Sequence, residues 1–369
     1  KRNCFIGWFL IYFMQDFERH NKNFFSFVDK IGPNEKVGIL THSNCVDGMI
    51  SAVFLIEILK RKLPNMPVPH VGFIPYKLGI LDEYEEIFNL DGIKKVFILD
   101  ANVDMNQLEE TERFFDKFDV MFIDHHPLNP KLRVTEKMIK THSDDCTSLV
   151  LYKLGEKLLE EKEWVELACI AAISEFSFNN DENLKFIQKH YSFDREDYQE
   201  EEVFHKVLKL NSLITYYIKD SRKAYEIILN KDYDEIDRVN KEISQEFDRC
   251  MKDFEENAER YFNNLLYFYF FKSKFSIGSR LSTTVSVKHK ESTIIMLSDI
   301  EGTNLIKVSG RSNSKELNYD LGDMIRAGIN GLDKAIGGGH PRAVGGSFLK
   351  KDIDKFKQNI IGYVENRLK

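Results

Sequence analysis

Short apolar runs that alternate with helical patterns dominate the first third of the chain and limit the folds it can adopt. The apolar runs cover residues 36–41, 67–76, 94–100 and 119–124. The segments between them, residues 47–63, 81–88 and 105–118, carry apolar side chains at helical spacing. Continuous apolar strands separated by helices are typical of a parallel sheet that is covered on both faces. In such sheets, ligands bind beyond the carboxyl ends of the strands.

After this first third, the pattern of the 369-residue chain becomes helical and then β-rich. This order predicts two domains joined by a helical linker. Residues 147–175 and the glycine-free stretch 181–262 have helical patterns. β-like runs follow at 264–271, 283–289, 292–299 and 304–312, before a glycine cluster at 335–348 and a helix from Asp352. We expect an α/β fold with a parallel-sheet domain, a helical linker and a smaller α/β domain with a mixed sheet. The predicted segments are an N-terminal apolar helix (1–30), then 31–225, 226–262 and 263–369.

The charge balance and the cysteines disfavour two classes of protein. A net charge of −7 disfavours a protein that coats long nucleic acid, because neutralising phosphates needs a broad basic surface. The five cysteines are scattered without CxxC spacing. This pattern favours a reducing, cytoplasmic location over a disulfide framework.

The apolar run CFIGWFLIYFM at residues 4–14 raises the question of a membrane. It is shorter than the roughly 20 residues that span a bilayer, and no small-residue cleavage site follows it. We expect a helix that packs against the body of the protein or against a partner. Membrane contact through this run is the alternative.

Polar clusters stand at the ends of three of the predicted strands. THSNCVDG follows the first strand, LDANVD the third and IDHHP the fourth. Parallel strands end along one edge, where these candidate ligands can converge: His42, Asp47, Asp100, Asp124, His125 and His126. Imidazoles with carboxylates suit Mn²⁺ or Mg²⁺ ahead of zinc. The set is large enough for two ions about 4 Å apart, which can activate water and clamp a phosphoryl group.

Each cluster also has a structural explanation. An aspartate at a strand end, such as Asp100, often caps the next helix. A single histidine such as His42 is often an ordinary core or surface residue. The adjacent histidines are harder to explain by packing, because successive side chains point to opposite faces of a sheet. We expect one of them to bind metal and the other to face a substrate.

Two motifs, one in each half of the chain, have a recognisable order. DHH stands at 124–126, and VSGRS at 308–312 is followed by GGGHPRAVGG at 337–346. On these motifs the chain resembles the DHH-superfamily phosphoesterases, and its second half resembles the substrate-binding domain of their RecJ and oligoribonuclease branches. The matches cover nearly the whole chain. The resemblance implies a DHH catalytic domain at 31–225 and a substrate-binding domain at 263–369.

The resemblance also implies a role for each candidate residue. Metal ligands would be His42, Asp47, Asp100 and His125, with Asp100 as the bridge and Asp124 orienting His125. His126 would contact the scissile phosphate and support the leaving oxygen. Substrate-binding residues would be Ser309, Arg311, Gly338, Gly339 and His340. Arginine offers a bidentate fork for phosphate and glycines let the backbone approach an anion, although such glycines also occur in plain tight turns.

Two positions depart from the family pattern. The first motif, HSNCVDG, is one residue longer than H-x-D-x-D-G, so that Asn44 or Cys45 stands where an acid is expected. Either could supply a ligand atom. After the helical stretch, AAISEFSF at 171–178 offers Glu175 where the family has an aspartate, and Asp181 is the fallback.

The expected function is hydrolysis of short oligonucleotides to nucleoside monophosphates by an exonuclease of the RecJ-like or oligoribonuclease kind. Water activated by two divalent ions would attack the phosphate, with Mn²⁺ ahead of Mg²⁺. Expected substrates are short single-stranded RNA or DNA, or a small nucleotide such as a cyclic dinucleotide or 3′-phosphoadenosine 5′-phosphate. A homodimer remains open, and a non-catalytic replication-factor partner is the alternative from another class. Phe176, Phe178 or Tyr319 could stack on bases, although each is more often a core residue.

Overall fold

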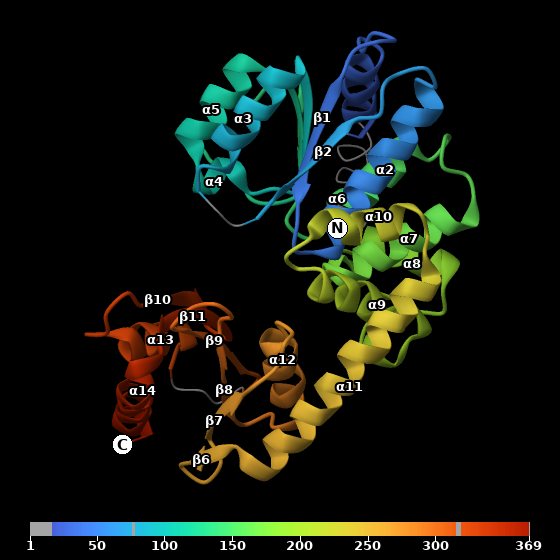
Figure 1. The fold of residues 1–369 in the computed structure, drawn as a ribbon. Coiled ribbons are helices and arrows are strands. Elements are labelled where there is room, and N and C mark those ends of the chain that lie inside the picture. The colour runs from blue at the N-terminus through green and yellow to red at the C-terminus, as the bar shows by residue number, and fades with distance from the viewer. Residues whose placement is uncertain (1–16, 76–77, 315–318, 369) are drawn as a thin grey trace, which may run out of the picture. The chain divides into compact units, whose positions relative to one another are not determined.

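The computed structural model describes residues 17–75, 78–314 and 319–368 of the chain (Figure 1). The chain divides into two compact units, Lys1–Asn240 and Lys241–Lys369, and the boundary falls within helix α11 (Tyr233–Asn257). That boundary lies inside the segment 226–262 that the sequence predicts to be a linker. The apolar run at 4–14 lies outside the described residues, and residues 17–28 are helical.

A five-stranded parallel sheet forms the centre of the first unit. Its strands are β1 (Val37–His42), β2 (His70–Ile74), β3 (Lys95–Leu99), β4 (Asp119–Asp124) and β5 (Met138–Lys140). They are ordered β2-β1-β3-β4-β5, so the carboxyl ends of β1, β3 and β4 are neighbours. The predicted parallel sheet is confirmed, and its strand order brings the polar clusters that follow these three strands to one edge.

Helices cover both faces of this sheet (Figure 1). On one face lie α3 (Ile80–Asp91), α4 (Val103–Asn106) and α5 (Leu108–Lys117); on the other lie the helix at 17–28 and α2 (Val46–Lys62). Phe88, Phe114 and Phe122 are buried between the sheet and the first set of helices. On the opposite face the ring of Phe27 packs edge-on to Phe97, with centroids 5.1 Å apart. This burial on two sides is why the central strands are continuously apolar.

The remainder of the first unit is helical, as the sequence predicts. Its helices are α6 (Thr147–Gly155), α7 (Lys162–Ser174), α8 (Asp181–His190), α9 (Glu202–Tyr216) and α10 (Ser221–Leu229). Single 3₁₀ turns occur at Ser177–Asn179 and Tyr198–Glu200. Of the helices in the described ranges, none is long and apolar enough to cross a membrane.

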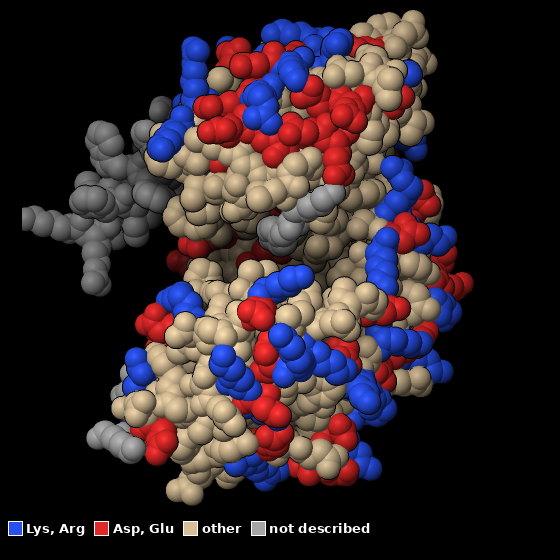
Figure 2. Space-filling model, turned by 60° about the vertical axis from the view of Figure 1, so that its left-hand side comes forward, with Lys and Arg blue, Asp and Glu red and all other residues tan. Residues whose placement is uncertain are grey.

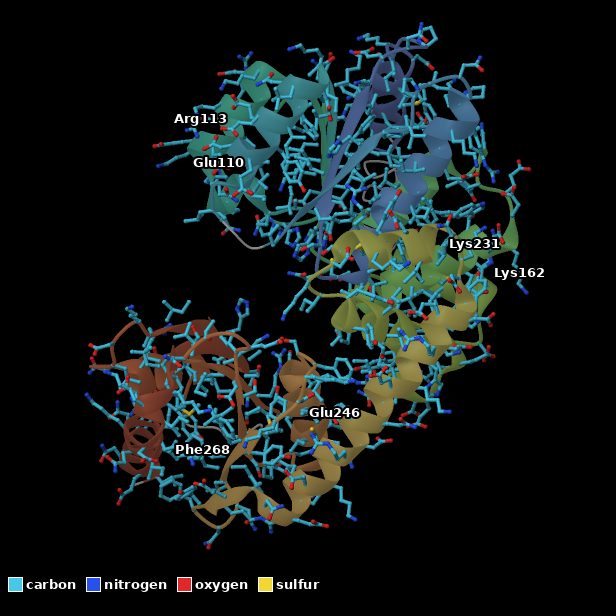
Figure 3. The ribbon with its side chains drawn as sticks, in the orientation of Figure 1. Glu110, Arg113, Lys162, Lys231, Glu246 and Phe268 are labelled. Carbon is cyan, nitrogen blue, oxygen red and sulfur yellow. The ribbon has the colours of Figure 1, made fainter. Side chains whose placement is uncertain are left out.

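The carboxylate of Glu110 joins α5 to α3 at the surface (Figure 3). It accepts hydrogen bonds from the backbone N–H groups of Leu81 (2.7 Å) and Asp82 (3.2 Å), in the first turn of α3. Arg113 pairs with Asp82 at 3.1 Å. Acidic and basic side chains interleave over this part of the molecule in Figure 2. This face therefore lacks the broad basic surface that long nucleic acid would need.

A six-stranded mixed sheet forms the second unit. Its strands are β6 (Glu259–Tyr261), β7 (Leu266–Phe271), β8 (Thr293–Asp299), β9 (Leu305–Ser312), β10 (Ile336–His340) and β11 (Ala343–Leu349), ordered β10-β11-β9-β8-β7-β6. Only the β7–β8 pair is parallel. α13 (Leu321–Ile329) and α14 (Ile353–Leu368) pack on one face over a core that includes Phe268, labelled in Figure 3. The predicted mixed sheet is confirmed.

Residues 283–288 are helical, so the strand predicted at 283–289 is wrong. The stretch TTVSVKH alternates polar and apolar residues, which favours a strand by its period. In the structure it belongs to α12 (Gly278–Lys288), where the buried Leu281 and Val285 stand four residues apart on one face. The helical repeat begins at Leu281, before the segment that alternates. Two further differences concern strands. The sequence pattern does not predict β5, which has only three residues. The glycine cluster at 335–348 forms the strands β10 and β11, which are joined by a tight connection.

Gly48 lets the first turn of α2 approach the end of β1. A Cβ atom at this position would stand 2.4 Å from the carbonyl oxygen of His42. The hydroxyl of Thr41 donates a hydrogen bond to the carbonyl of Gly48. The close contact fixes the position of His42 relative to the start of α2.

Gly48→Ala should therefore destabilise the first unit by about 1–3 kcal/mol, because the added methyl group meets backbone that cannot move aside. Gly362→Ala is the matched control: Gly362 is also helical, and a Cβ atom there would meet nothing within 4 Å. The control should stabilise its unit by about 0.5–1 kcal/mol through the lower backbone entropy of the unfolded chain. Urea unfolding, followed for the unit that carries each substitution, measures both changes in the free energy of unfolding. If both substitutions changed the free energy of unfolding in the same direction, the close contact at Gly48 would be contradicted.

Candidate functional site

Asp100 lies directly after β3, at the centre of the edge where the polar clusters meet. It is 2% exposed, and its backbone is in the left-handed region at φ 49°, which is uncommon outside glycine. Its backbone N–H donates to the carbonyl of Ile123 at 3.0 Å, which ties this turn to β4. Burial, followed by the charge of Asp47, raises the pKa of Asp100 to about 6. Asp100 is thus a buried carboxylate that needs cationic partners to stay ionised.

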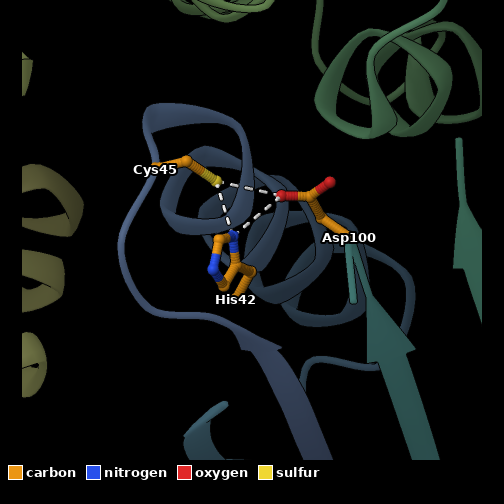
Figure 4. A group of neighbouring side chains, drawn as sticks. All are labelled: His42, Cys45 and Asp100. Atoms are coloured by element: carbon orange, nitrogen blue, oxygen red, sulfur yellow. Dashed lines mark hydrogen bonds and ion pairs between the residues drawn. The ribbon is translucent and has the colours of Figure 1, made fainter. Parts of the chain in front are cut away.

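His42 and Cys45 contact one oxygen of this carboxylate (Figure 4). His42 is the last residue of β1, and Cys45 is the N-cap of α2, where its sulfur accepts the N–H of Gly48 at 3.2 Å. Cys45 Sγ lies 3.2 Å from Nδ1 of His42 and donates to Oδ2 of Asp100 at 3.1 Å. Asn44 is exposed. Of the two residues left open by the sequence, the structure therefore brings Cys45 into the cluster.

His125 and His126 stand on the other side of Asp100, directly after β4. Nε2 of His125 lies 3.3 Å from Oδ1 of Asp100 and 3.8 Å from Oδ2 of Asp47. Nδ1 of His126 lies 4.0 Å from the same Asp100 oxygen, and the two imidazole centroids are 4.6 Å apart. His125 is thus the nearer imidazole to this oxygen, whereas Nδ1 of His126 lies closer to Asp124, at 2.7 Å.

The imidazoles differ in how readily they take a proton. Burial, followed by the charge of His126, lowers the pKa of His42 to about 4. Burial also lowers the pKa of His125, but contact with Asp100 and the charge of Asp47 outweigh it and raise this pKa to about 10. His42 is thus neutral and ready to act as a ligand, whereas His125 holds a proton that an ion would have to replace.

Asp124 pairs with His126 rather than with His125, the residue that the family resemblance assigns to it. Oδ1 of Asp124 is 2.7 Å from Nδ1 of His126, and Nζ of Lys140 donates to Oδ2 at 2.6 Å. Burial raises the pKa of Asp124, but these two partners outweigh it and hold the pKa at about 2. Lys140 also donates to Asp104 at 3.1 Å. Asp124 therefore orients His126 and remains ionised.

Asp47 lies within the cluster, but its carboxylate caps α6. Oδ2 accepts the backbone N–H of Thr147 at 2.8 Å, and Oδ1 accepts the N–H of Ser148 at 2.7 Å and the thiol of Cys146 at 3.2 Å. Capping satisfies helix donors that would otherwise lack partners. In the described arrangement both oxygens are used, so the metal role predicted for Asp47 would have to be shared with this cap.

Glu175 ends α7 and lies within electrostatic reach of the cluster. Its pKa rises to about 8, first through burial and then through the charges of Asp47 and Asp100. The fallback residue Asp181 begins α8, has a side chain that is 81% exposed and pairs with Arg195. The structure therefore favours Glu175 over Asp181 as the additional carboxylate.

A cleft of about 300 Å³ opens beside the cluster. It is lined by His42, Ile74, Pro75, Leu78, Asp100, Ala101, Asn102, Val103, Asn106, Gln107 and His126. The lining combines apolar side chains and amides with three residues of the cluster. Such a surface can hold a small polar molecule against the imidazoles.

The donor set fits divalent ions. Two groups of three have ligand atoms within 4.8 Å of one another, and both contain Asp100: one adds His42 and Cys45, the other His125 and His126. Oδ1 of Asp100 is buried and makes no hydrogen bond with any residue that the structure describes. Its nearest cationic neighbour is the imidazole of His125 at 3.3 Å, and a metal ion that replaced the His125 proton would satisfy both groups. The resemblance and the donor chemistry therefore agree.

The predicted phosphate-binding residues lie together on the sheet of the second unit. Arg311 of β9, Ala343 of β11 and His340 of β10 are in register, so their side chains share a face. Ser309, Gly345 and Gly338 form the adjacent row on that face. A Cβ atom at Gly338 would meet nothing within 4 Å, so this row is open.

Gly339 has a different role from Gly338 in the same strand. Its φ is 144°, and a Cβ atom there would stand 2.3 Å from the carbonyl of Ala343. Glycine is therefore required to close the β10–β11 hairpin. The hairpin sets the register that places His340 level with Arg311.

Lys140 and Asp104 are site residues that the sequence does not reveal. Both are nearly inaccessible, with side chains 10% and 0% exposed, and Asp104 also accepts the backbone N–H of Asn129 at 2.8 Å. Lys140 stands on the short strand β5, and Asp104 lies in the one-turn helix α4. The sequence does not show that β5 pairs with β4, and this pairing is what places Lys140 between the carboxylates of Asp104 and Asp124.

The fold and the centre define a two-unit α/β protein with a histidine–carboxylate cluster at the carboxyl edge of a parallel sheet. Residues 36–173 match the DHH family, N-terminal domain. This match lies within the first unit and includes all five strands of its parallel sheet. No curated protein matches the sequence.

Solved structures resemble nearly the whole chain at low identity. RecJ from Thermus thermophilus, in complex with Mn²⁺, has a TM-score of 0.63 and 13% identity, covering 94% of this chain and 55% of RecJ. CDC45 from Entamoeba histolytica has a TM-score of 0.60 and 10% identity, covering 94% and 98%. A pGpG-specific phosphodiesterase from Vibrio cholerae has a TM-score of 0.50 and 12% identity, covering 90% and 100%. The chain thus spans just over half of RecJ, and at these identities the likeness shows the fold.

Lys140→Met should destabilise the first unit by about 3–5 kcal/mol, because it leaves the buried carboxylates of Asp104 and Asp124 without their shared cation. Lys137→Met is the matched control, since Lys137 pairs with Asp119 at the surface and should cost no more than about 1 kcal/mol. Urea unfolding measures both. Equal losses would show that Lys140 is not a structural counter-ion.

Proposed function

We propose that this protein is a metal-dependent phosphodiesterase that hydrolyses short oligonucleotides to nucleoside monophosphates. The observation that carries the proposal is the meeting of two ligand groups on one buried carboxylate, Asp100, beside a cleft of about 300 Å³. The DHH fold supports phosphoester chemistry, and the RecJ relative contains Mn²⁺. We therefore infer two divalent ions, with Mn²⁺ ahead of Mg²⁺.

The residues around the cleft suit an in-line attack on phosphorus. Bound divalent ions lower the pKa of water and neutralise phosphate charge. His126 lines the cleft, and because its Nδ1 is bonded to Asp124, Nε2 is the nitrogen left to face a substrate. Burial lowers the pKa of His126, but the contact with Asp124 outweighs it and raises this pKa, which favours an Nε2–H that can donate to the leaving oxygen. Asp124 and Lys140 hold the ring in place for that step.

Several features favour a short substrate. The cleft is small, and acidic and basic side chains interleave on the face shown in Figure 2, which disfavours a long strand on that face. Phe176 is 48% exposed and stands next to Glu175, where a nucleobase could stack on it. Phe178 is buried, and Tyr319 pairs its hydroxyl with Thr293 at 3.0 Å, so these two serve the core. On the second unit, Arg311 and His340 share one face of the sheet, where they could bind a phosphate group of an oligonucleotide.

A small nucleotide is the second candidate substrate. The V. cholerae relative is specific for pGpG, and it is matched over its entire length. A cleft of about 300 Å³ lies at the small end of the usual range for ligand pockets. A non-catalytic role, as for a replication-factor partner, is disfavoured because the cluster keeps three imidazoles and Asp100 in contact.

The test is cleavage of end-labelled RNA and DNA ladders of two to about twenty-four nucleotides, with cyclic di-AMP in parallel and Mn²⁺ present. We expect the shortest oligomers to be cut fastest and EDTA to abolish the reaction. His126→Ala should lower kcat by about 100-fold or more, because it removes the general acid. His205→Ala, an exposed histidine on α9, is the matched control and should cut normally.

Each outcome has a distinct meaning. Preference for cyclic di-AMP would favour the small-nucleotide alternative, and processive cutting of the longest strands would favour a RecJ-like role. Cleavage that survives both EDTA and His126→Ala would contradict the proposal, as would the absence of any cleavage.

A further inference from the structure

The two ligand groups around Asp100 are chemically unlike. The group on the Oδ1 side has two imidazoles, those of His125 and His126, whereas the group on the Oδ2 side has one imidazole and the sulfur of Cys45. The three atoms of the second group come from the end of β1, the N-cap of α2 and the turn after β3 (Figure 4). We propose that the position held by His42, Cys45 and Asp100 selects a thiophilic divalent ion such as Zn²⁺, and that the centre is therefore of mixed metal type.

The spacing of these atoms suits a tetrahedral ion. Sγ lies 3.2 Å from Nδ1 of His42 and 3.1 Å from Oδ2 of Asp100, and the nitrogen and oxygen are 4.0 Å apart. Bonds of roughly 2.0–2.3 Å at tetrahedral angles place ligand atoms about 3.4–3.6 Å apart. Each of the three observed distances is within about half an ångström of this range. Small side-chain rotations would therefore bring all three atoms onto one ion.

The chemistry of the sulfur decides which ion is preferred. Thiolates bind zinc far better than they bind Mg²⁺ or Mn²⁺, which favour oxygen ligands. Binding breaks the Sγ–H bond, forms a metal–sulfur bond and releases the proton to solvent, so that Oδ2 of Asp100 loses the thiol donor and gains the ion. The Oδ1 side, where His125 is the nearest imidazole, has no sulfur and suits Mn²⁺. One shared carboxylate would then join a zinc-type position to a manganese-type position.

The fold fixes the position of this sulfur. Cys45 caps the 17-residue helix α2, where the backbone N–H of Gly48 points at Sγ from 3.2 Å. Burial and then the charge of Asp100 raise the pKa of the Cys45 thiol, and the N–H of Gly48 lowers it, so a bound cation is what would replace the thiol proton. A plain cap would explain the contact with Gly48 but not the convergence of His42 and Asp100 on the same atom. A serine at position 45 could still cap the helix but could not supply a thiolate to a metal ion. Cys45→Ser therefore distinguishes a capping role from a metal-binding role.

The experiment uses Co²⁺ as the probe, because a cobalt–thiolate bond gives a charge-transfer band in the near ultraviolet that oxygen and nitrogen ligands do not. Titration of the full chain with Co²⁺ should produce a saturable band. Cys45→Ser keeps a capping side chain, and Cys45→Asp supplies the family's acid; both should lose the band. Cys250→Ser, which removes a buried thiol in the second unit, should keep it.

Competition measures the selectivity. Zn²⁺ should displace the bound Co²⁺ at near-stoichiometric amounts, whereas a tenfold excess of Mn²⁺ should not. In Cys45→Asp, zinc affinity should fall at least tenfold relative to manganese affinity. Far-ultraviolet circular dichroism of each variant checks that the fold is kept.

The inference rests on the proposed function for the existence of a metal centre, but the two can fail separately. Co²⁺ binding without a charge-transfer band, or a band that survives in Cys45→Ser, would overturn the thiolate site and leave the phosphodiesterase proposal standing. A Cys45-dependent band in a protein that cleaves no oligonucleotide would support the site and count against the proposed activity. Failure of Co²⁺, Zn²⁺ and Mn²⁺ to bind at all would overturn both.

Discussion

The structure of the centre depends on the carboxylate of Asp100 and on the two ligand groups that share it. The aspartate is buried, its backbone is left-handed, and its two oxygens face different groups of donors. No single strand could supply those donors. The strand order β2-β1-β3-β4-β5 places β3 between β1 and β4, so that Asp100 receives His42 and Cys45 from one neighbour and the histidine pair from the other.

Buried charges around this carboxylate are held by helix caps and by one lysine. Asp47 is fully buried and caps α6, and Asp124 is fixed by His126 and Lys140. Breaking such a pair would leave a charge without a partner at a cost of about 3–5 kcal/mol. The scaffold therefore fixes the orientation of the imidazoles before any ligand binds.

Much of this arrangement follows from the sequence, because strands of a parallel sheet are continuously apolar and end at one edge. The four strands and the residues that follow them were therefore predictable, and so was their meeting at Asp100. The role of Lys140 could not be predicted, because the three residues of β5 are too few to show a strand pattern. The cap made by Asp47 could not be predicted either, because its partners lie 100 residues away. The alternation at 283–289 is misleading, since the buried spacing of α12 begins at Leu281.

If Asp100 bridges two metal positions, as we propose, each chain should bind two ions, and the number of ions bound per chain is the quantity to measure. Inductively coupled plasma mass spectrometry of the dialysed full chain, loaded with Zn²⁺ and Mn²⁺, should find two ions per chain. In Asp100→Asn, which keeps the size of the side chain and removes its charge, both should be lost or weakened together. Two ions retained in Asp100→Asn, or none in the unaltered protein, would show that Asp100 does not bridge two metal ions.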